Sequence, residues 1–437
     1  MQLKEHIGKV FWAFADKALF ILYGFIMLFQ IKHTANQFEY GLFALMINLN
    51  SWVLVLSDSF ALQGIVQFGN DMSKRKKIDA LSLILHLSTC IALPLIIFSF
   101  HRPIGELFRI QNFYMISVGA LTITLLAAPR SYMVKIFYRD YHLIRIFLTN
   151  LAFFGTMTAV SLYFIYNKPS LTFIDFYTIY LWGSVIGAGT AIAIGITKIS
   201  FDFKGIGVEL KKYIKFGAPM TFIAILHSIP RNLDVYLIQL LFGNEALIGV
   251  YNAAKTLYRL FDEASSAAYG LIYPSAVKKI AAGNIKELAD IITKAVSFMF
   301  AGFLVMGAFL FLGGAQWLVT TFLNERFYSA LGLFDIFVIA SFFLPFISIA
   351  TIITAMGKVH TTLKYVIIST LSSVFAFIII GLMKWEGALP IGIIVYNAVL
   401  GGLSFFYIKK WVGFPVKSIL RAFTDTRGFV KSLVGKQ

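Results

Sequence analysis

The sequence predicts an all-α integral membrane protein with about twelve transmembrane helices in two parallel six-helix lobes and with both termini in the cytoplasm. Three observations predict this fold: the composition, the spacing of the apolar runs, and a repeat between the two halves. Of the 437 residues, 59% are hydrophobic and 14% are charged, against roughly 45–50% and 25% in an ordinary soluble domain. Such a composition excludes a soluble enzyme and places nearly the whole chain in or at a bilayer.

A helix needs about 20 mostly apolar residues to cross the hydrocarbon core of a membrane. The chain contains twelve such runs, at 10–31, 40–68, 80–100, 113–133, 143–166, 174–197, 217–242, 246–273, 289–313, 332–356, 364–383 and 388–408. Each run is long enough for one crossing, and the segments between them are short.

Lysine and arginine are distributed unequally between the two sides that these crossings define. If the N-terminus is cytoplasmic, 28 of the 38 Lys and Arg residues fall on the inner side and 6 in the outer loops. Because cytoplasmic loops are enriched in these residues, both termini are predicted to be cytoplasmic. The basic segment 409–437 interleaves apolar and cationic residues, which predicts an amphipathic helix on the inner leaflet.

An internal repeat relates the two halves at an offset of 208 residues, where residues 40–45 resemble residues 248–253. An acid follows in each half, Asp58 and Asp262, and then a basic cluster. Six helices per half give both halves the same membrane orientation, so the repeats are predicted to be parallel. The resulting organisation is an N-terminal lobe at 1–200, a cytoplasmic linker at 201–216, a C-terminal lobe at 217–408 and a tail at 409–437.

Ionisable residues inside the predicted helices point to a functional site, because each charge at a helix centre costs about 2.5–3.5 kcal/mol. They are Asp16, Lys17, Asp58, Arg231, Asp234, Lys255, Arg259, Asp262 and Glu263. Two helical stripes follow from a spacing of i, i+4 and i+7, one formed by His227, Arg231 and Asp234 and the other by Lys255, Arg259 and Asp262, one turn after Tyr251. Pro230 predicts a kink beside Arg231.

Three interpretations of these charges stay open from spacing alone. In the first, Arg231, Lys255 and Arg259 form a cationic patch for an anionic group such as a phosphate. In the second, the charges neutralise one another within the membrane. In the third, the acids alone carry protons. The acids that would couple to an ion or pair with the cations are Asp58, Asp234 and Asp262, and the weaker site candidates are Asp16, Lys17, His227 and Tyr251.

Sequence motifs for common enzymatic chemistry are missing. Cys90 is the only cysteine, and no two of the seven histidines stand four residues apart as a helical zinc pair requires. Gly357-Lys358 is followed by Val359, so there is no Walker-type loop. We therefore expect no metal site, no cofactor and no enzymatic activity. The net charge of +17 is spread over short loops, so we expect no nucleic-acid partner.

Seven segments spread over nearly the whole chain share a pattern with a known family. They are Glu39–Leu45, Lys215–Pro219, Asn232–Asp234, Gly249–Ala254, Tyr273–Ser275, Asn324–Ala330 and Ala355–Lys358. In these segments the chain resembles the polysaccharide and lipid-linked oligosaccharide flippases, of the O-antigen flippase type, in the multidrug/oligosaccharidyl-lipid/polysaccharide (MOP) exporter superfamily.

The resemblance implies a two-lobed, MATE-like bundle in the bacterial cytoplasmic membrane that flips an isoprenoid-diphosphate glycolipid to the outer leaflet by alternating access. Its central cationic cavity would correspond to Arg231, Lys255 and Arg259. The first helix departs from the family pattern, since these flippases commonly carry an arginine where this chain has Asp16-Lys17. Membrane lipids and other polysaccharide-assembly proteins are the implied partners. A cation-coupled multidrug exporter and a membrane glycosyltransferase or polymerase stay as alternatives, the latter disfavoured by short outer loops.

Overall fold

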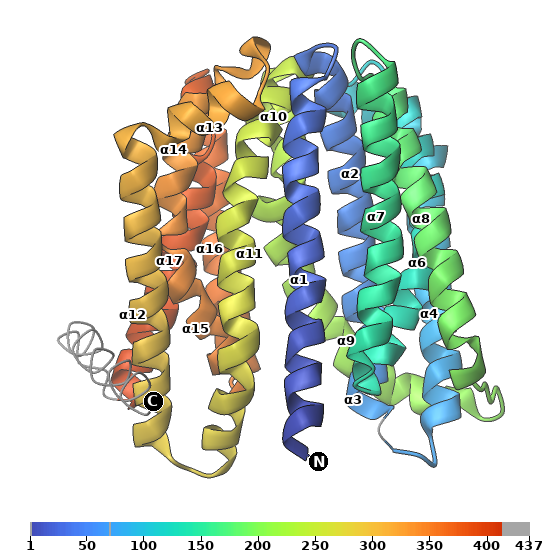
Figure 1. Ribbon diagram of the computed structural model, residues 1–437. Coiled ribbons are helices and arrows are strands. Elements are labelled where there is room, and N and C mark those ends of the chain that lie inside the picture. The colour runs from blue at the N-terminus through green and yellow to red at the C-terminus, as the bar shows by residue number, and fades with distance from the viewer. Residues whose placement is uncertain (1, 70, 413–437) are drawn as a thin grey trace. The chain divides into compact units, whose positions relative to one another are not determined.

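The computed structural model describes residues 2–69 and 71–412, and the described chain is almost entirely helical (Figure 1). Within these ranges, the only extended pairing is an isolated bridge between Thr34 and Leu171. The predicted amphipathic tail, beyond residue 412, lies outside the described residues. The prediction of an all-α membrane protein is confirmed.

The contacts between residues divide the chain into two compact units. Unit 1 comprises Met1–Ala253 and Phe322–Phe327, and unit 2 comprises Ala254–Thr321 and Tyr328–Gln437. Residues 201–216, predicted as a linker, belong to unit 1, and the lobe boundaries of the sequence analysis stay a prediction.

Unit 1 contains the first ten helices and the start of the eleventh. Their bounds are α1 Gln2–Lys32, α2 Gln37–Ser57, η1 Asp58–Leu62, α3 Gln63–Phe68, α4 Arg75–Ser99, α5 His101–Phe108, α6 Phe113–Arg139, α7 Leu143–Asn167, α8 Phe173–Gly195, η2 Ile196–Lys198, α9 Ile206–Ser228, η3 Ile229–Leu233, α10 Asp234–Phe242 and α11 Glu245–Ala281. The short helix η5 Glu325–Phe327 also belongs to this unit.

Unit 2 begins within α11 and contains the remaining helices. Their bounds are α12 Ile285–Phe309, η4 Leu310–Gly314, α13 Ala315–Phe322, α14 Ala330–Ser341, α15 Leu344–Ala355, α16 Val359–Leu382, η6 Glu386–Ala388 and α17 Ile391–Val412. In its core, buried residues of α11, α12, α15 and α17 pack together. Ile292, Ile353 and Ile408 of this core are fully buried.

All twelve predicted crossings fall on helical segments. Among the described residues, eight helices are long and apolar enough to cross a membrane, or up to nine if the bent pair α14–α15 is one span. Helices α1, α9 and α11 are absent from that set. Ionisable residues predicted to lie in the membrane occur on α1 and α11, and just after α9 in η3 and α10. A protein with this many apolar helices is a multi-pass membrane protein.

Helix α2 is the central element of unit 1. Almost every residue from Tyr40 to Asn50 is buried, because α2 packs against α4, α6, α8 and α9. Helices α7 and α8 continue the bundle, with α1 packed on α7 (Figure 1). An apolar helix with no polar face requires such complete enclosure by neighbours.

One end of unit 1 is closed by loop contacts between α1–α2 and α7–α8. The backbone N–H of Leu171 donates to the His33 carbonyl at 2.7 Å, and the Phe173 N–H donates to the Glu39 carboxylate at 2.7 Å. Thr172 and Asp175 form a capping box at the start of α8. These bonds satisfy the exposed N–H groups of the first helical turn.

The opposite end of unit 1 is held by ion pairs between α4 and the end of α6. Arg139 bonds to the Asp79 carboxylate, and both side chains are at most 1% exposed. Arg75 pairs with Asp140 at 2.5 Å, and Arg139 pairs with Asp140 at 3.0 Å. Partial burial acts to raise the pKa of Asp140, but the hydrogen bonds and charges of Arg139 and Arg75 outweigh it and leave this pKa below its usual value.

Candidate functional site

Helix α6 carries two cations that meet acids and an amide from three other helices of unit 1. The apolar run predicted for this crossing ends at residue 133, and Arg130 and Lys135 are among the 28 cations assigned to the inner side. The structure extends α6 to Arg139, so both residues lie inside a helix that qualifies as a membrane span. Their partners come from α1, α2 with η1 and α3, and α7.

Arg130 belongs to a three-residue chain that crosses unit 1. Its Nη2 donates to Asn150 Oδ1 at 2.6 Å, and Asn150 Nδ2 donates to Asp16 Oδ1 at 2.6 Å. Because the amide donates on one side and accepts on the other, its orientation is determined by its two charged partners. The amide of α7 thus bridges the cation of α6 and the acid of α1.

The guanidinium of Arg130 is placed for a further interaction. Its carbon atom lies 4.0 Å from the centroid of the Phe153 ring, a cation–π contact. Its Nε is buried and has no hydrogen-bond partner among the described residues. The described residues therefore leave one buried N–H of this guanidinium without a hydrogen-bond partner.

Asp58 is the acidic partner of the second cation. Lys135 Nζ lies 2.7 Å from Asp58 Oδ1, and Gln63 Nε2 donates to Asp58 Oδ2 at 2.9 Å. Asp58 is the first residue of η1, a π-helical turn that interrupts α2. Such turns are frequent at functional sites, since the extra residue per turn redirects a side chain. The predicted coupling acid Asp58 is therefore paired, with a side chain 38% exposed.

These contacts define two polar groups of unit 1, Asp16 with Asn150 and Arg130, and Asp58 with Lys135 and Gln63, which we together call the unit 1 polar cluster. It contains two acids and two cations, so its formal charge is balanced. Lys17, the neighbour of Asp16, is exposed. Pairing of this kind is what membrane-embedded charges require.

Sequence reasoning missed four members of the cluster, Gln63, Arg130, Lys135 and Asn150. Asn150 has no local signal, because an isolated amide in an apolar helix carries no pattern. A signal for the two cations did exist. Met133, Ile136 and Phe137 continue the buried face of α6 beyond the predicted helix end, and this helical spacing would have extended the helix.

The break predicted at Pro230 is present, as the π-helical turn η3 between α9 and α10. The three residues of the first predicted stripe, in and beside this turn, differ in burial. His227 is half-buried, Arg231 is exposed and Asp234 is fully buried. Tyr251, also in unit 1, donates its hydroxyl to Asp234 Oδ2 at 2.6 Å. The structure therefore brings together two candidate residues that sequence spacing had placed in separate stripes.

The second predicted stripe lies on α11 within unit 2. Lys255 is buried, at 5% exposure, whereas Arg259 and Asp262 are half-buried. A lysine this deeply buried on a helix predicted to cross the membrane is costly and is typical of a binding or coupling position. Whether Lys255 and Arg259 bind substrate stays a prediction.

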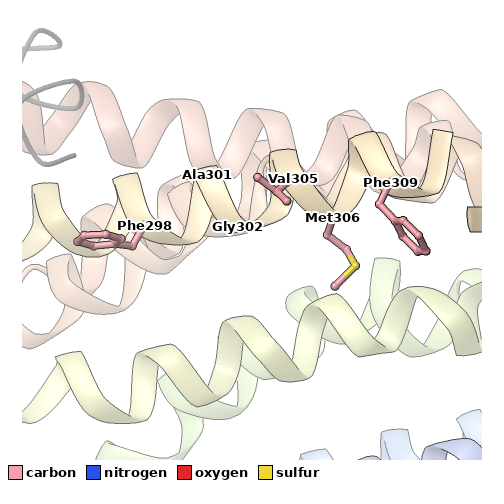
Figure 2. A pocket seen from close by; sticks show the side chains of 6 residues that line it. All are labelled: Phe298, Ala301, Gly302, Val305, Met306 and Phe309. Atoms are coloured by element: carbon pink, nitrogen blue, oxygen red, sulfur yellow. The ribbon is translucent and has the colours of Figure 1, made fainter. Parts of the chain in front are cut away.

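An apolar hollow of about 670 Å³ lies along α12 in unit 2 (Figure 2). Its six lining residues are Phe298, Ala301, Gly302, Val305, Met306 and Phe309. None of these side chains offers a charge or a hydrogen bond, so the hollow does not suit a polar head group. No group of three or more potential metal ligands occurs among the residues described.

No family model matches the sequence, and no curated protein matches it significantly. Solved structures do match. Lipid II flippase MurJ, in an inward closed conformation, has a TM-score of 0.70 and 17% identity, over 98% of this chain and 93% of the other. An inward-facing multidrug resistance MATE family transporter of the MOP superfamily has a TM-score of 0.68 and 15% identity, over 91% and 94%.

A MOP superfamily transporter from Pyrococcus furiosus also matches, with a TM-score of 0.52 and 17% identity over 92% of both chains. Its description states that the reverse polarity of its binding pocket suggests a different function. At these identities the likeness shows the fold. The chain has the fold of MOP superfamily transporters, as the resemblance implied.

Proposed function

We propose that this chain is a transporter that flips a polyprenyl-diphosphate-linked oligosaccharide from the inner to the outer leaflet of a bacterial cytoplasmic membrane, for polysaccharide biosynthesis. The lipid tail stays in the bilayer while the head group crosses by alternating access. Arg231, Lys255 and Arg259 bind the diphosphate. The fold shared with a lipid II flippase supports this proposal.

The observation that carries the proposal is the burial of Lys255, 5% exposed, on a helix that also bears Arg259. A diphosphate loses its hydration when it enters a membrane protein, and cations on the protein offset that cost. A carrier of cationic drugs has no such need for buried cations.

The membrane potential supplies a driving force for this direction of transport. Moving one charge across 100 mV is worth about 2.3 kcal/mol, so a head group with two negative charges gains about 4–5 kcal/mol on leaving a negative interior. The alternative source of energy is a gradient of protons or sodium ions that bind to Asp58, Asp234 or Asp262.

A cation-coupled multidrug exporter is the second candidate. The shared fold with a multidrug MATE transporter and the fully buried Asp234 favour it. Buried acids of this kind carry protons or bind cations in transporters. The two candidates therefore differ in which charges contact the substrate.

Transport by the purified protein in vesicles tests the proposal, with a fluorescent polyprenyl-diphosphate oligosaccharide and a cationic dye offered in parallel. We expect the glycolipid to change leaflet, and the double variant Arg231→Gln/Arg259→Gln to reduce the rate at least tenfold. The matched control is Lys286→Gln/Lys358→Gln, which removes the same charge from exposed positions of the chain. Transport of the dye alone would favour the multidrug exporter, and normal flipping by the double variant would leave the arginines as structural partners.

A further inference from the structure

The connection between α8 and α9 in unit 1 is an ordered segment that is fastened to the start of α4. The Asp202 N–H donates to the Lys76 carbonyl at 3.3 Å, and the Asp202 carboxylate lies 4.0 Å from Lys77 Nζ. The same carboxylate accepts the Lys204 N–H at 2.9 Å. Asp202 therefore holds this connection against the start of α4.

Two aromatic side chains flank Asp202 and are exposed. Phe201 is 41% exposed and Phe203 is 60% exposed, and their ring centroids lie 5.9 Å apart. Exposure of two adjacent phenylalanines to water is unfavourable. Their position next to the end of α8, a helix that qualifies as a membrane span, places them where a chain enters the bilayer.

The first turns of α9 bury one face and expose a basic one. On the buried face, Tyr213 packs with Ile206 and Leu210 against α4, and its hydroxyl bonds to the Ala61 carbonyl. The opposite face exposes Lys211, Lys212, Ile214 and Lys215. Because Tyr213 anchors α9 to unit 1, this basic face has a constant orientation.

Within residues 201–215, the connection and the start of α9 expose Phe201, Phe203, Lys204, Lys211, Lys212, Ile214 and Lys215, which we call the basic aromatic surface. The neighbouring acids are occupied, since Asp202 pairs with Lys77 and Glu209 lies 3.6 Å from Lys74. In the part of the chain that the structure describes, the four lysines of this surface have no acidic partner within ion-pair distance. The surface is therefore cationic as well as partly apolar.

We propose that the basic aromatic surface is a docking site for anionic phospholipid of the surrounding membrane. The lysine ammonium groups contact the lipid phosphates, while Phe201 and Phe203 enter the acyl region. Apolar and basic side chains together on a surface segment are the combination that binds anionic membrane surfaces. This proposal does not depend on the substrate that the protein moves.

The test measures binding of fluorescent phosphatidylglycerol and phosphatidylcholine to the full-length protein in detergent. We expect tighter binding of phosphatidylglycerol, and a loss of that preference by at least threefold in Lys204→Gln/Lys211→Gln/Lys212→Gln/Lys215→Gln. The matched control is Lys286→Gln/Lys358→Gln/Lys364→Gln/Lys409→Gln, which removes equal charge from other exposed positions. An equal loss in both variants, or no preference in the unaltered protein, would overturn the proposal.

A second measurement does not rely on the lysine variants folding. A spin label on Phe203→Cys, in a Cys90→Ala background, reports whether this position lies in lipid or in water. In vesicles containing phosphatidylglycerol we expect the label to be more accessible to oxygen than to a water-soluble nickel complex, by at least twofold. A label that is equally accessible to both reagents would show that the surface does not enter the membrane.

Discussion

Gly41 of α2 and Gly249 of α11 face each other where these two helices cross closely within unit 1. A Cβ atom on Gly41 would lie 1.9 Å from the Glu245 carbonyl oxygen, and one on Gly249 would lie 2.1 Å from the Gln37 carbonyl oxygen. These are the two glycines that the internal repeat aligns at an offset of 208 residues. The equivalent glycines of the two repeats therefore contact each other's helix, because small residues let helix backbones approach closely in membranes.

Alanine at either glycine is expected to destabilise the protein by about 1–3 kcal/mol, because the added methyl group meets backbone that has no rotamer to change. Thermal unfolding in detergent measures the effect. Gly24→Ala is the matched control, since a Cβ at Gly24 has no neighbour within 4 Å. If Gly41→Ala and Gly24→Ala were equally stable, the close crossing would be contradicted.

Replacement of Asn150 by leucine is expected to remove both hydrogen bonds of the bridge between Arg130 and Asp16. The two charged groups then lose a partner within unit 1, at a cost of about 2 kcal/mol in the free energy of unfolding. Asn167→Leu provides the control, because Asn167 lies on the same helix but is exposed. An unchanged stability of Asn150→Leu would mean that the bridge contributes nothing to the folded state.

The ion pair of Asp58 with Lys135 is open to a double-mutant cycle with Asp58→Asn and Lys135→Met. We expect a coupling energy of about 1 kcal/mol, a modest value because the Asp58 side chain is 38% exposed and the Lys135 side chain is 18% exposed. Additive single effects would argue against a direct pair. The transport rate of Asp58→Asn at several proton and sodium gradients separately tests its role as a coupling acid.

Asp140 is expected to contribute to acid sensitivity. Its pKa is lower in the folded protein than in the unfolded chain, because Arg139 and Arg75 stabilise the carboxylate against the effect of partial burial. The unfolded state therefore binds this proton first, and the stabilisation is complete above the unfolded pKa and is lost as the pH falls through the folded one. Asp140→Asn should show a weaker loss of stability below about pH 4, measured by unfolding at a series of pH values.

Several features of the fold could be predicted from local sequence. Each predicted apolar run falls on helical structure, because the length of a crossing is set by the bilayer, and eight or up to nine of the described helices are long and apolar enough to span it. Pro230 marked the break that is η3, since proline cannot complete the helical hydrogen bond. The pairing of Tyr251 with Asp234 could not be predicted, because it depends on how α11 packs against α10.

The sequence by itself determined that this chain is a helical membrane protein with ionisable residues in its membrane segments, because hydrophobic length and charge spacing are local properties. Only the tertiary structure decided which of those charges meet. Asp16 and Asn150 are 134 residues apart, yet they share a hydrogen bond, and Arg130 joins them from a third helix. Contacts of this kind depend on the rotation and depth of each helix in the bundle, which packing of the whole unit determines.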